Sequence, residues 1–218
     1  MPRIRPPIIA PGMLPIPPNT AAVKALTDCV VTSGNAKKVI DSFPQDAKII
    51  FGPDYNLGNY INSVTGRNML LWNGGCHVHE KFSVEAIVKL KQEHPEAVVM
   101  AHLECKAPVL AVADVKGSTA TMLHYAQEHP EIKEYIIATE AGILHELERN
   151  CPDVIFYPVP PEVSEGGVGC SCNECEYMKM NSLKKIYNSL KFGWPTVEVA
   201  PEIAKDAVKP IEKMLSLS

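Results

Sequence analysis

The sequence predicts an α/β protein made of repeated three-layer αβα domains with parallel sheets, in the Rossmann-like class. Two observations carry this prediction. Short apolar runs such as 98–100 alternate with amphipathic stretches of helical length, as is typical of strands buried on both faces of a parallel sheet. The chain also contains an internal repeat, in which Asp28 matches Asp114 and Ile49 matches Ile136, and its offset of about 86 to 87 residues indicates duplicated βα units.

The two copies are expected to contain the same elements in the same order. Each has a helix, a hydroxyl-rich turn, a second helix, a strand, an amphipathic helix and a last strand. The predicted helices that can be bounded lie at 21–28, 36–42, 107–114, 120–128, 181–190 and 201–215. The predicted strands lie at 48–51, 69–72, 97–101, 135–138 and 154–157.

Four segments follow from this pattern. Residues 1–18 contain seven prolines and are expected to be extended and disordered, because proline fixes φ and removes a backbone donor. The first αβα repeat is assigned to 19–80 and the second to 81–176. Residues 177–218 are expected to form a helical tail.

Composition excludes several classes of partner. The chain has 218 residues, 21% of them charged, and a formal net charge of −4, which argues against a nucleic-acid or anionic-membrane surface. Its apolar runs are too short to span a bilayer. The odd count of seven cysteines, without a secretory leader, favours reduced thiols in the cytoplasm over a disulfide framework. Cys29, Cys105 and Cys151 lie in or beside apolar segments and are interpreted as small buried side chains.

Metal chemistry is predicted at the two glycine-rich ends of the repeat. The first copy closes at Cys76, and the second closes at the cluster of Cys170, Cys172 and Cys175. Thiolates at loop ends favour a soft metal or an iron–sulfur cluster. A zinc-binding structural or interaction module that uses Cys76, His79 and the 170–175 cluster is the alternative. No predicted strand is followed by G-x-G-x-x-G, which argues against a nicotinamide-dependent oxidoreductase.

Polar side chains at strand ends and helix starts suggest catalysis and anion binding. His102 and Glu104 follow the strand at 97–101, where a carboxylate with a nearby imidazole suits proton transfer, although an isolated pair of this kind also occurs in surface turns. The turns at 32–35 and 117–119 precede helices and suit a carboxylate or phosphate.

The turns at 54–58 and 139–142 are equivalent in the repeat. Both connect a strand to a helix. They are interpreted first as helix caps, with lining of the site as the alternative.

Four motifs together resemble one known family. The segments 51–58, 71–79, 113–119 and 175–180 read FGPDYNLG, LWNGGCHVH, ADVKGST and CEYMKM. They are similar to the quinolinate synthase A family, and the resemblance extends over about 20–215.

The resemblance implies three pseudo-symmetric αβα domains around one [4Fe-4S] cluster, with one cysteine ligand from each domain and one iron free to act as a Lewis acid. It implies a transferase that condenses iminoaspartate with dihydroxyacetone phosphate to give quinolinate, in the de novo biosynthesis of NAD. A functional link to L-aspartate oxidase or aspartate dehydrogenase is also implied.

Residue roles are carried over from the family's motifs. Cys76 matches the metal ligand in G-x-C-x-V-H, and Cys175 matches the ligand that precedes x-x-M. His102 and Glu104 match an H-P-E motif in which the glutamate is the acid/base, with Leu103 in place of the proline.

Substrate-binding roles are carried over in the same way. Ser33 and Thr119, with Ser118 beside the latter, match positions that bind substrate carboxylate or phosphate. Asn19 falls in the place of the family's Y-x-N-T segment.

The family's first domain, with its own cluster cysteine, should precede residue 20. The sequence therefore predicts an N-terminally truncated chain with two of the three repeats, of doubtful activity by itself. Uncovered domain faces are then expected to cause self-association.

Overall fold

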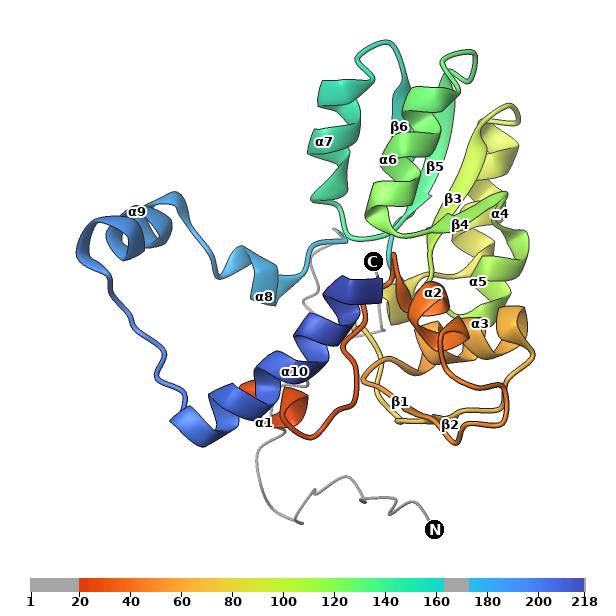
Figure 1. Cartoon of the computed structure of the whole chain (residues 1–218). Coiled ribbons are helices and arrows are strands. Elements are labelled where there is room, and N and C mark those ends of the chain that lie inside the picture. Colours follow the sequence, from red (N-terminus) through yellow and green to blue (C-terminus); the bar gives the residue numbers. More distant parts are fainter. Residues whose placement is uncertain (1–19, 163–172, 218) are drawn as a thin grey trace. The chain divides into compact units, whose positions relative to one another are not determined.

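The computed structural model describes residues 20–162 and 173–217 (Figure 1). These residues divide into two units. One contains 31–162, 173–197 and Leu217, and the other contains 20–30 and 198–216. Both sheets, and all the residues discussed below as a site, belong to the first unit.

Four parallel strands form the larger sheet, in the order β4-β3-β5-β6. They are β3 (Val98–His102), β4 (Val115–Gly117), β5 (Glu134–Ala138) and β6 (Ile155–Pro158). The central strands β3 and β5 pair with Val99 opposite Ile136, and their last four residues are buried. This burial on both faces explains the continuous apolar runs in the sequence.

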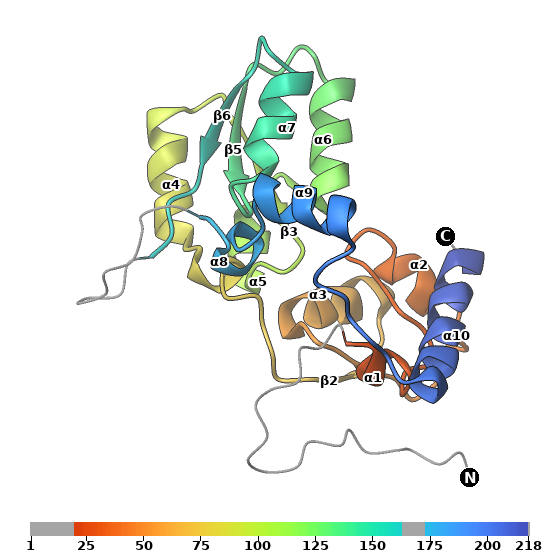
Figure 2. The ribbon, with the colours of Figure 1, turned by 90° about the vertical axis from the view of Figure 1, so that its left-hand side faces the viewer.

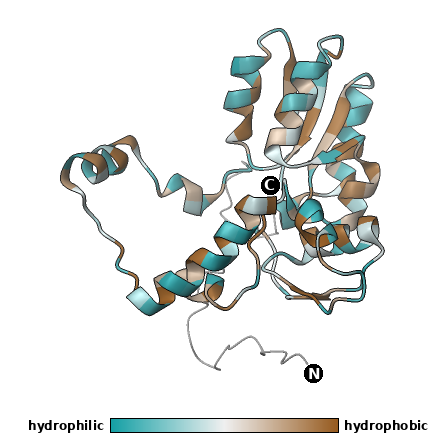
Figure 3. Ribbon diagram, in the orientation of Figure 1, coloured by the Kyte–Doolittle hydropathy of each residue, from teal (hydrophilic) through white to brown (hydrophobic). Residues whose placement is uncertain are grey.

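Helices cover both faces of the larger sheet (Figure 2). They are α4 (Val84–Glu93), α5 (Ala107–Val112), α6 (Thr119–Glu128) and α7 (Ile143–Asn150). Val99 and Ile136 pack with Ile87 of α4 on one face, whereas alternate strand residues pack with α6 and α7 on the other. Figure 3 shows hydrophobic strands between helices with hydrophilic stretches, so the protein has the three layers that the sequence predicts.

The smaller sheet has two parallel strands, β1 (Ile50–Phe51) and β2 (Leu70–Leu71). It packs with α2 (Ala36–Asp41) and α3 (Tyr55–Thr65), and the 3-10 turn η1 (His79–Lys81) follows.

Gly58 allows α3 to lie close to this sheet. A Cβ at this position would be 2.6 Å from Leu71 Cδ2 and 2.9 Å from Phe51 Cδ1. The sheet remains open to solvent on the other side, where Leu70 is 67% exposed.

The two sheets exchange core residues. Leu103, directly after β3, is 7% exposed and packs in the cluster that contains Phe51 and Leu57 of the smaller sheet and its helix. Conversely, Val78 and Phe82, which follow β2, pack in the core on the α4 face of the larger sheet. The segments that follow β2 and β3 are therefore fixed by both cores.

The remaining elements are helical. In the first unit, α8 (Glu176–Lys179) and α9 (Leu183–Phe192) expose most of their apolar side chains. The other unit contains α1 (Ala21–Lys24) and α10 (Pro201–Leu217). There the backbone N–H of Val30, in the segment after α1, donates to the Pro210 carbonyl of α10 at 3.3 Å. Within the described residues, no helix combines the length and apolar character needed to cross a membrane.

The α/β class and the parallel sheets are confirmed. Most predicted helices and strands are present, with β1 and β2 shorter than expected. The strand β4 was not predicted, because the sequence at 115–117 was not distinguished from the adjoining turn. The predicted proline-rich segment 1–18 lies outside the described residues, and the segmentation at 19–80, 81–176 and 177–218 stays a prediction.

Candidate active site at the carboxyl ends of the strands

Strand ends from both sheets bring polar groups together. His102 is the last residue of β3, and Thr139 directly follows its neighbour β5. Cys76 and His79 follow β2, which belongs to the smaller sheet. Parallel α/β sheets bind ligands at the carboxyl ends of their strands, so these residues lie where a site is expected.

His79 is the centre of this group. Its Nδ1 lies 3.3 Å from Glu104 Oε2, and its Nε2 lies 2.9 Å from the hydroxyl of the buried Thr139. The ring also stacks on His102, with 4.5 Å between ring centroids. Both ring nitrogens of His79 thus face polar partners, and its orientation is fixed by three neighbours.

Cys76 completes the group. Ligand atoms of Cys76, His79 and Glu104 all lie within 4.8 Å of one another, a set that could hold a metal ion. The central position of His79 was not predicted from the sequence, which indicated this residue only as a possible zinc ligand. Its spacing in Cys-x-x-His is the signal that placed it near Cys76.

The charges of Cys76 and His79 are coupled. Burial alone would raise the pKa of the Cys76 thiol, but its hydrogen bond to His79 and the charge on that ring outweigh burial and lower the pKa. Burial alone would lower the pKa of His79, but the hydrogen bonds from its ring to Cys76 and Glu104 raise it to about 9. The arrangement therefore favours a thiolate beside an imidazolium.

Glu104 and His102 are tuned in a complementary way. Burial would raise the pKa of Glu104, but the hydrogen bond from His79 and the charge on that ring outweigh burial and lower the pKa overall. Burial and the charge on His79 lower the pKa of His102 to about 4, against the opposing effect of Glu104. At neutral pH the pair supplies a carboxylate and an uncharged imidazole, which are groups suited to proton transfer.

The second predicted thiol ligand, Cys175, lies on a neighbouring loop. The rings of His77 and Tyr177 meet edge to face with 5.3 Å between centroids, so the loop after Cys76 touches the helix that begins after Cys175. Both cysteines pack against the same core cluster. The structure thus brings the two predicted ligand loops together, whereas Cys170 and Cys172 lie outside the described residues.

The two predicted anion-binding turns also meet. Ser118 is the N-cap of α6, and its hydroxyl accepts from the Thr121 N–H at 3.2 Å. A Cβ built on Gly34 would lie 3.5 Å from Ser118 Oγ, so the turn that contains Ser33 adjoins the start of α6. Thr119, the first residue of α6, is exposed. Asn19 lies outside the described residues.

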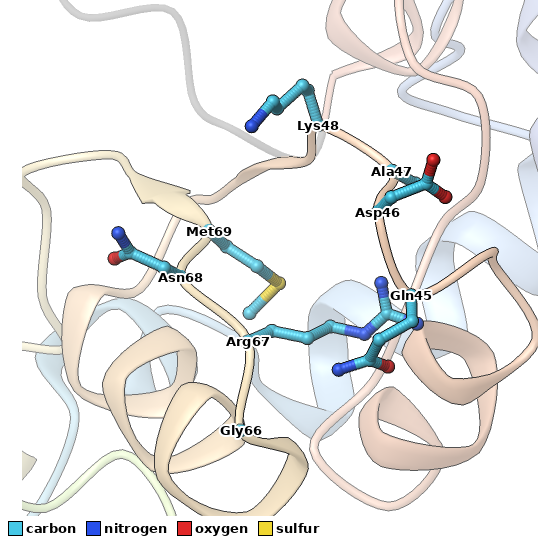
Figure 4. A pocket seen from close by; sticks show the side chains of 8 residues that line it. All are labelled: Gln45, Asp46, Ala47, Lys48, Gly66, Arg67, Asn68 and Met69. Carbon is cyan, nitrogen blue, oxygen red and sulfur yellow. The ribbon is translucent and has the colours of Figure 1, made fainter.

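Two shallow hollows lie away from this group. One, of about 190 Å³, is lined by residues 45–48 and 66–69 (Figure 4), and Arg67 there donates to the carbonyls of Phe43 and Pro44. The other, of about 290 Å³, is lined mainly by α3 and α5. Arg67 is already bonded to backbone carbonyls, and no histidine or cysteine among the described residues lines either hollow, so neither is a better candidate than the group at the strand ends.

Two of the remaining cysteines are structural, as predicted. Cys105 and Cys151 are buried, and the Cys105 thiol donates to the Ala138 carbonyl at 3.4 Å. Burial raises the pKa of Cys105 to about 12, so it stays a thiol. Cys29 is only partly buried.

Comparison with known proteins identifies relatives over nearly the whole chain. The stretch at residues 18–216 matches the family model described as "NadA: Quinolinate synthetase A protein". Proteins called "Quinolinate synthase" from Trichodesmium erythraeum (strain IMS101) and Chloroherpeton thalassium (strain ATCC 35110 / GB-78) are 45% and 43% identical over 199 residues.

These matches cover 91% of this chain and 60% of each relative. The chain therefore spans about three fifths of the length of the curated relatives it matches. The matched region includes β1 to β6, the Cys76 and Cys175 loops and the His79–Glu104 pair. The chain belongs to the quinolinate synthetase A family.

Proposed function

We propose that this chain supplies catalytic groups of a quinolinate synthase, which condenses iminoaspartate with dihydroxyacetone phosphate to give quinolinate, phosphate and water. The reaction would serve de novo NAD biosynthesis in the cytoplasm, downstream of L-aspartate oxidase or aspartate dehydrogenase. The observation that carries this proposal is the Glu104 carboxylate held by His79 beside the Cys76 thiol at the carboxyl ends of the strands. Family membership supports it and disfavours the zinc module.

The donor set fits an iron–sulfur cluster. Cys76 has a lowered pKa, which favours the thiolate form that metal binding requires, and the Cys175 loop lies beside it. We assign one ligand position to each of these two cysteines. When bound, the [4Fe-4S] cluster would supply Lewis acidity at an iron without a protein ligand. The third cysteine implied by the family pattern is not assigned among the described residues.

Proton transfer is assigned to Glu104. Its lowered pKa keeps it a carboxylate that can take a proton from a substrate carbon and return it to a leaving hydroxyl. His79 holds the carboxylate in place, and Thr139 fixes the far nitrogen of that ring. His102, uncharged at neutral pH, offers a hydrogen bond without adding positive charge.

Anion binding is assigned to the two adjoining turns. Ser118 and Thr119 lie at the start of α6, and Ser33 lies in the turn before α2. Hydroxyls and free backbone N–H groups at such places favour the carboxylates of iminoaspartate and the phosphate of dihydroxyacetone phosphate. We retain Asn19 as a further substrate-binding residue by its position in the sequence.

The proposal is tested by anaerobic reconstitution of the chain, followed by assays of iron, sulfide and quinolinate. Cys76→Ser should lose iron and sulfide. Glu104→Gln should retain both but reduce quinolinate formation by roughly 10²- to 10⁴-fold, the usual contribution of a general acid or base. A wild-type protein completed with the part of its relatives' length that this chain does not span, and which still takes up neither iron nor sulfide, would overturn the proposal. Stoichiometric zinc in a colourless protein would support the zinc module instead.

A further inference from the structure

Two carboxylates occupy equivalent places beside the two cysteine loops. We propose that Asp54 and Glu140 are positioning residues, each of which holds one thiol-ligand loop by its backbone amide while its other oxygen accepts from a backbone N–H where a helix starts. The assignment of Cys76 and Cys175 as ligands rests on the proposed function. The attachment of the two loops to these carboxylates does not.

Asp54 divides its two oxygens between two tasks. Oδ1 accepts from the Leu57 N–H at 2.7 Å, which caps α3, and Oδ2 accepts from the Cys76 N–H at 2.9 Å. The side chain is buried, with 6% exposure. A buried carboxylate with both oxygens committed can hold the Cys76 backbone in one place relative to α3.

Glu140 makes the same division in the second copy of the repeat. Its Oε2 accepts from the Gly142 N–H at 2.7 Å, at the start of α7, and its Oε1 accepts from the Cys175 N–H at 3.1 Å. The backbone around it is tied to the same loop, because the Ala141 N–H donates to the Asn173 carbonyl at 3.0 Å.

The equivalence follows the chain order of each copy. A strand (β1 or β5) is followed by the acidic residue, a helix, the neighbouring strand (β2 or β6) and then the cysteine. Asp54 and Glu140 differ in length by one methylene, yet both reach the cysteine amide. The shared contact therefore belongs to the repeated architecture and not to one local turn.

Capping by itself does not require a carboxylate. Ser83, Ser118 and Ser182 cap α4, α6 and α9 with a single hydroxyl oxygen. The second oxygen of Asp54 or Glu140 is the added feature, and in both copies it goes to the residue that carries the thiol. Each loop is thereby positioned before any metal binds. Groups that hold the coordinating residues in place, without themselves contacting the metal, raise metal affinity in this way.

Substitutions can separate the two tasks. Asp54→Ser keeps a hydroxyl for the α3 cap but is too short to hold Cys76 as well. Asp54→Asn and Glu140→Gln keep the shape but replace one acceptor oxygen by an NH2 group, so one of the two N–H bonds must be lost. Ser182→Ala, which removes the cap of the exposed α9, is the matched control for loss of a cap alone.

The first measurement is residue-resolved amide hydrogen exchange of the metal-free chain. Asp54→Ser should speed exchange at Cys76 by about tenfold or more and leave Cys175 unchanged, and Glu140→Ala, which removes both acceptor oxygens, should do the reverse. Asp54→Asn and Glu140→Gln should speed exchange at one of the two amides that each carboxylate holds, Cys76 or Leu57 and Cys175 or Gly142.

Ser182→Ala should change exchange at neither cysteine amide. Unchanged exchange at both cysteine amides in folded Asp54→Ser and Glu140→Ala variants would overturn the proposal. If the Asp54 variants do not fold, the exchange rates of the Glu140 variants test the proposal alone, because the Glu140 side chain is partly exposed and its replacement is better tolerated.

The second measurement is the iron and sulfide bound after anaerobic reconstitution, with the rate at which iodoacetamide modifies each cysteine. Asp54→Ser and Glu140→Ala should each lose bound iron several-fold and should each show faster alkylation at the variant's own cysteine alone. A completed wild-type protein without iron would count against the proposed function, while the exchange and alkylation results would still decide whether the carboxylates hold the loops. Normal exchange with reduced iron would show that the carboxylates act in another way and would overturn the positioning role.

Discussion

His102 shows how a single buried ring is controlled by its neighbours. It is 6% exposed, stacks on His79 and lies next to Glu104. Burial and the charge on His79 together keep it neutral, because a second positive charge in the stack would be unfavourable. The folded protein therefore prefers the uncharged form of this ring more strongly than the unfolded chain does.

This preference predicts acid sensitivity. The pKa of His102 is about 4 in the folded state against an ordinary value of 6.5, so the unfolded state binds more protons between these values. The free energy of unfolding should fall as pH decreases from 6.5 towards 4, by about 3 kcal/mol at most, since each pKa unit is worth about 1.4 kcal/mol. Thermal melts across this range should show the loss.

His102→Gln provides the comparison, because it removes the titrating ring. Its melting temperature should decline less steeply over the same range. An equal decline in both proteins would show that His102 does not cause the sensitivity.

Position in the fold was sufficient to predict where some of the candidate residues lie, while their roles stay predictions. Glu104 and His102 were predicted from their place after a buried strand, and the structure puts both among the titratable groups at the strand ends. His79 was undervalued because its contact with Glu104 joins residues that follow strands of two different sheets. Spacing within one segment carries no information on such a contact.

At the level of elements, the position of α3 depends on Gly58. This residue lies in the helix interior, where glycine is intrinsically unfavourable by about 0.5–1 kcal/mol relative to alanine. Its presence is explained by the close approach of α3 to Phe51 and Leu71. Packing outweighs helix propensity at this position.

Gly58→Ala should therefore destabilise the protein. Overpacking of this kind costs about 1–3 kcal/mol, which exceeds the gain in helix propensity, so a net loss of about 1 kcal/mol or more is expected in chemical denaturation. Asn59→Ala, on the exposed side of the same helix, is the control and should be neutral or slightly stabilising. A stabilised Gly58→Ala protein would contradict the packing argument.

Long elements were easier to predict from the sequence than short ones. Strands β3 and β5 are five residues each and were predicted because both faces are buried. Strand β4 has three residues, of which Lys116 is exposed, so no apolar run marks it. It exists because the backbone of β3 offers a pairing edge, with Met100 opposite Val115, and that edge is a tertiary feature.

For the whole molecule, the most prominent surface feature is the apolar character of α9 and the segment after it. Leu183 and Leu190 are 86% and 85% exposed, and Phe192, Trp194 and Val197 are also exposed. Large apolar side chains that are exposed to water promote association when they come together on a surface.

The chain is therefore expected to self-associate. Sedimentation velocity over about a hundredfold range of concentration should show species larger than a monomer, because association buries apolar surface. Leu183→Lys combined with Leu190→Lys should shift the distribution towards monomer, whereas Lys184→Ser on the same helix should not. A monodisperse monomer at all concentrations would contradict this expectation.

Leu103 links the order of the candidate catalytic residues His102 and Glu104 to the order of the smaller sheet. Its side chain fills the core beneath β1 and β2, although its chain neighbours His102 and Glu104 face the site. A brief detachment of this small two-stranded layer would remove Leu103 from its packing and free the backbone between His102 and Glu104, while the larger sheet stayed intact. Mild warming should thus disorder the His102–Glu104 pair at temperatures below the main unfolding transition.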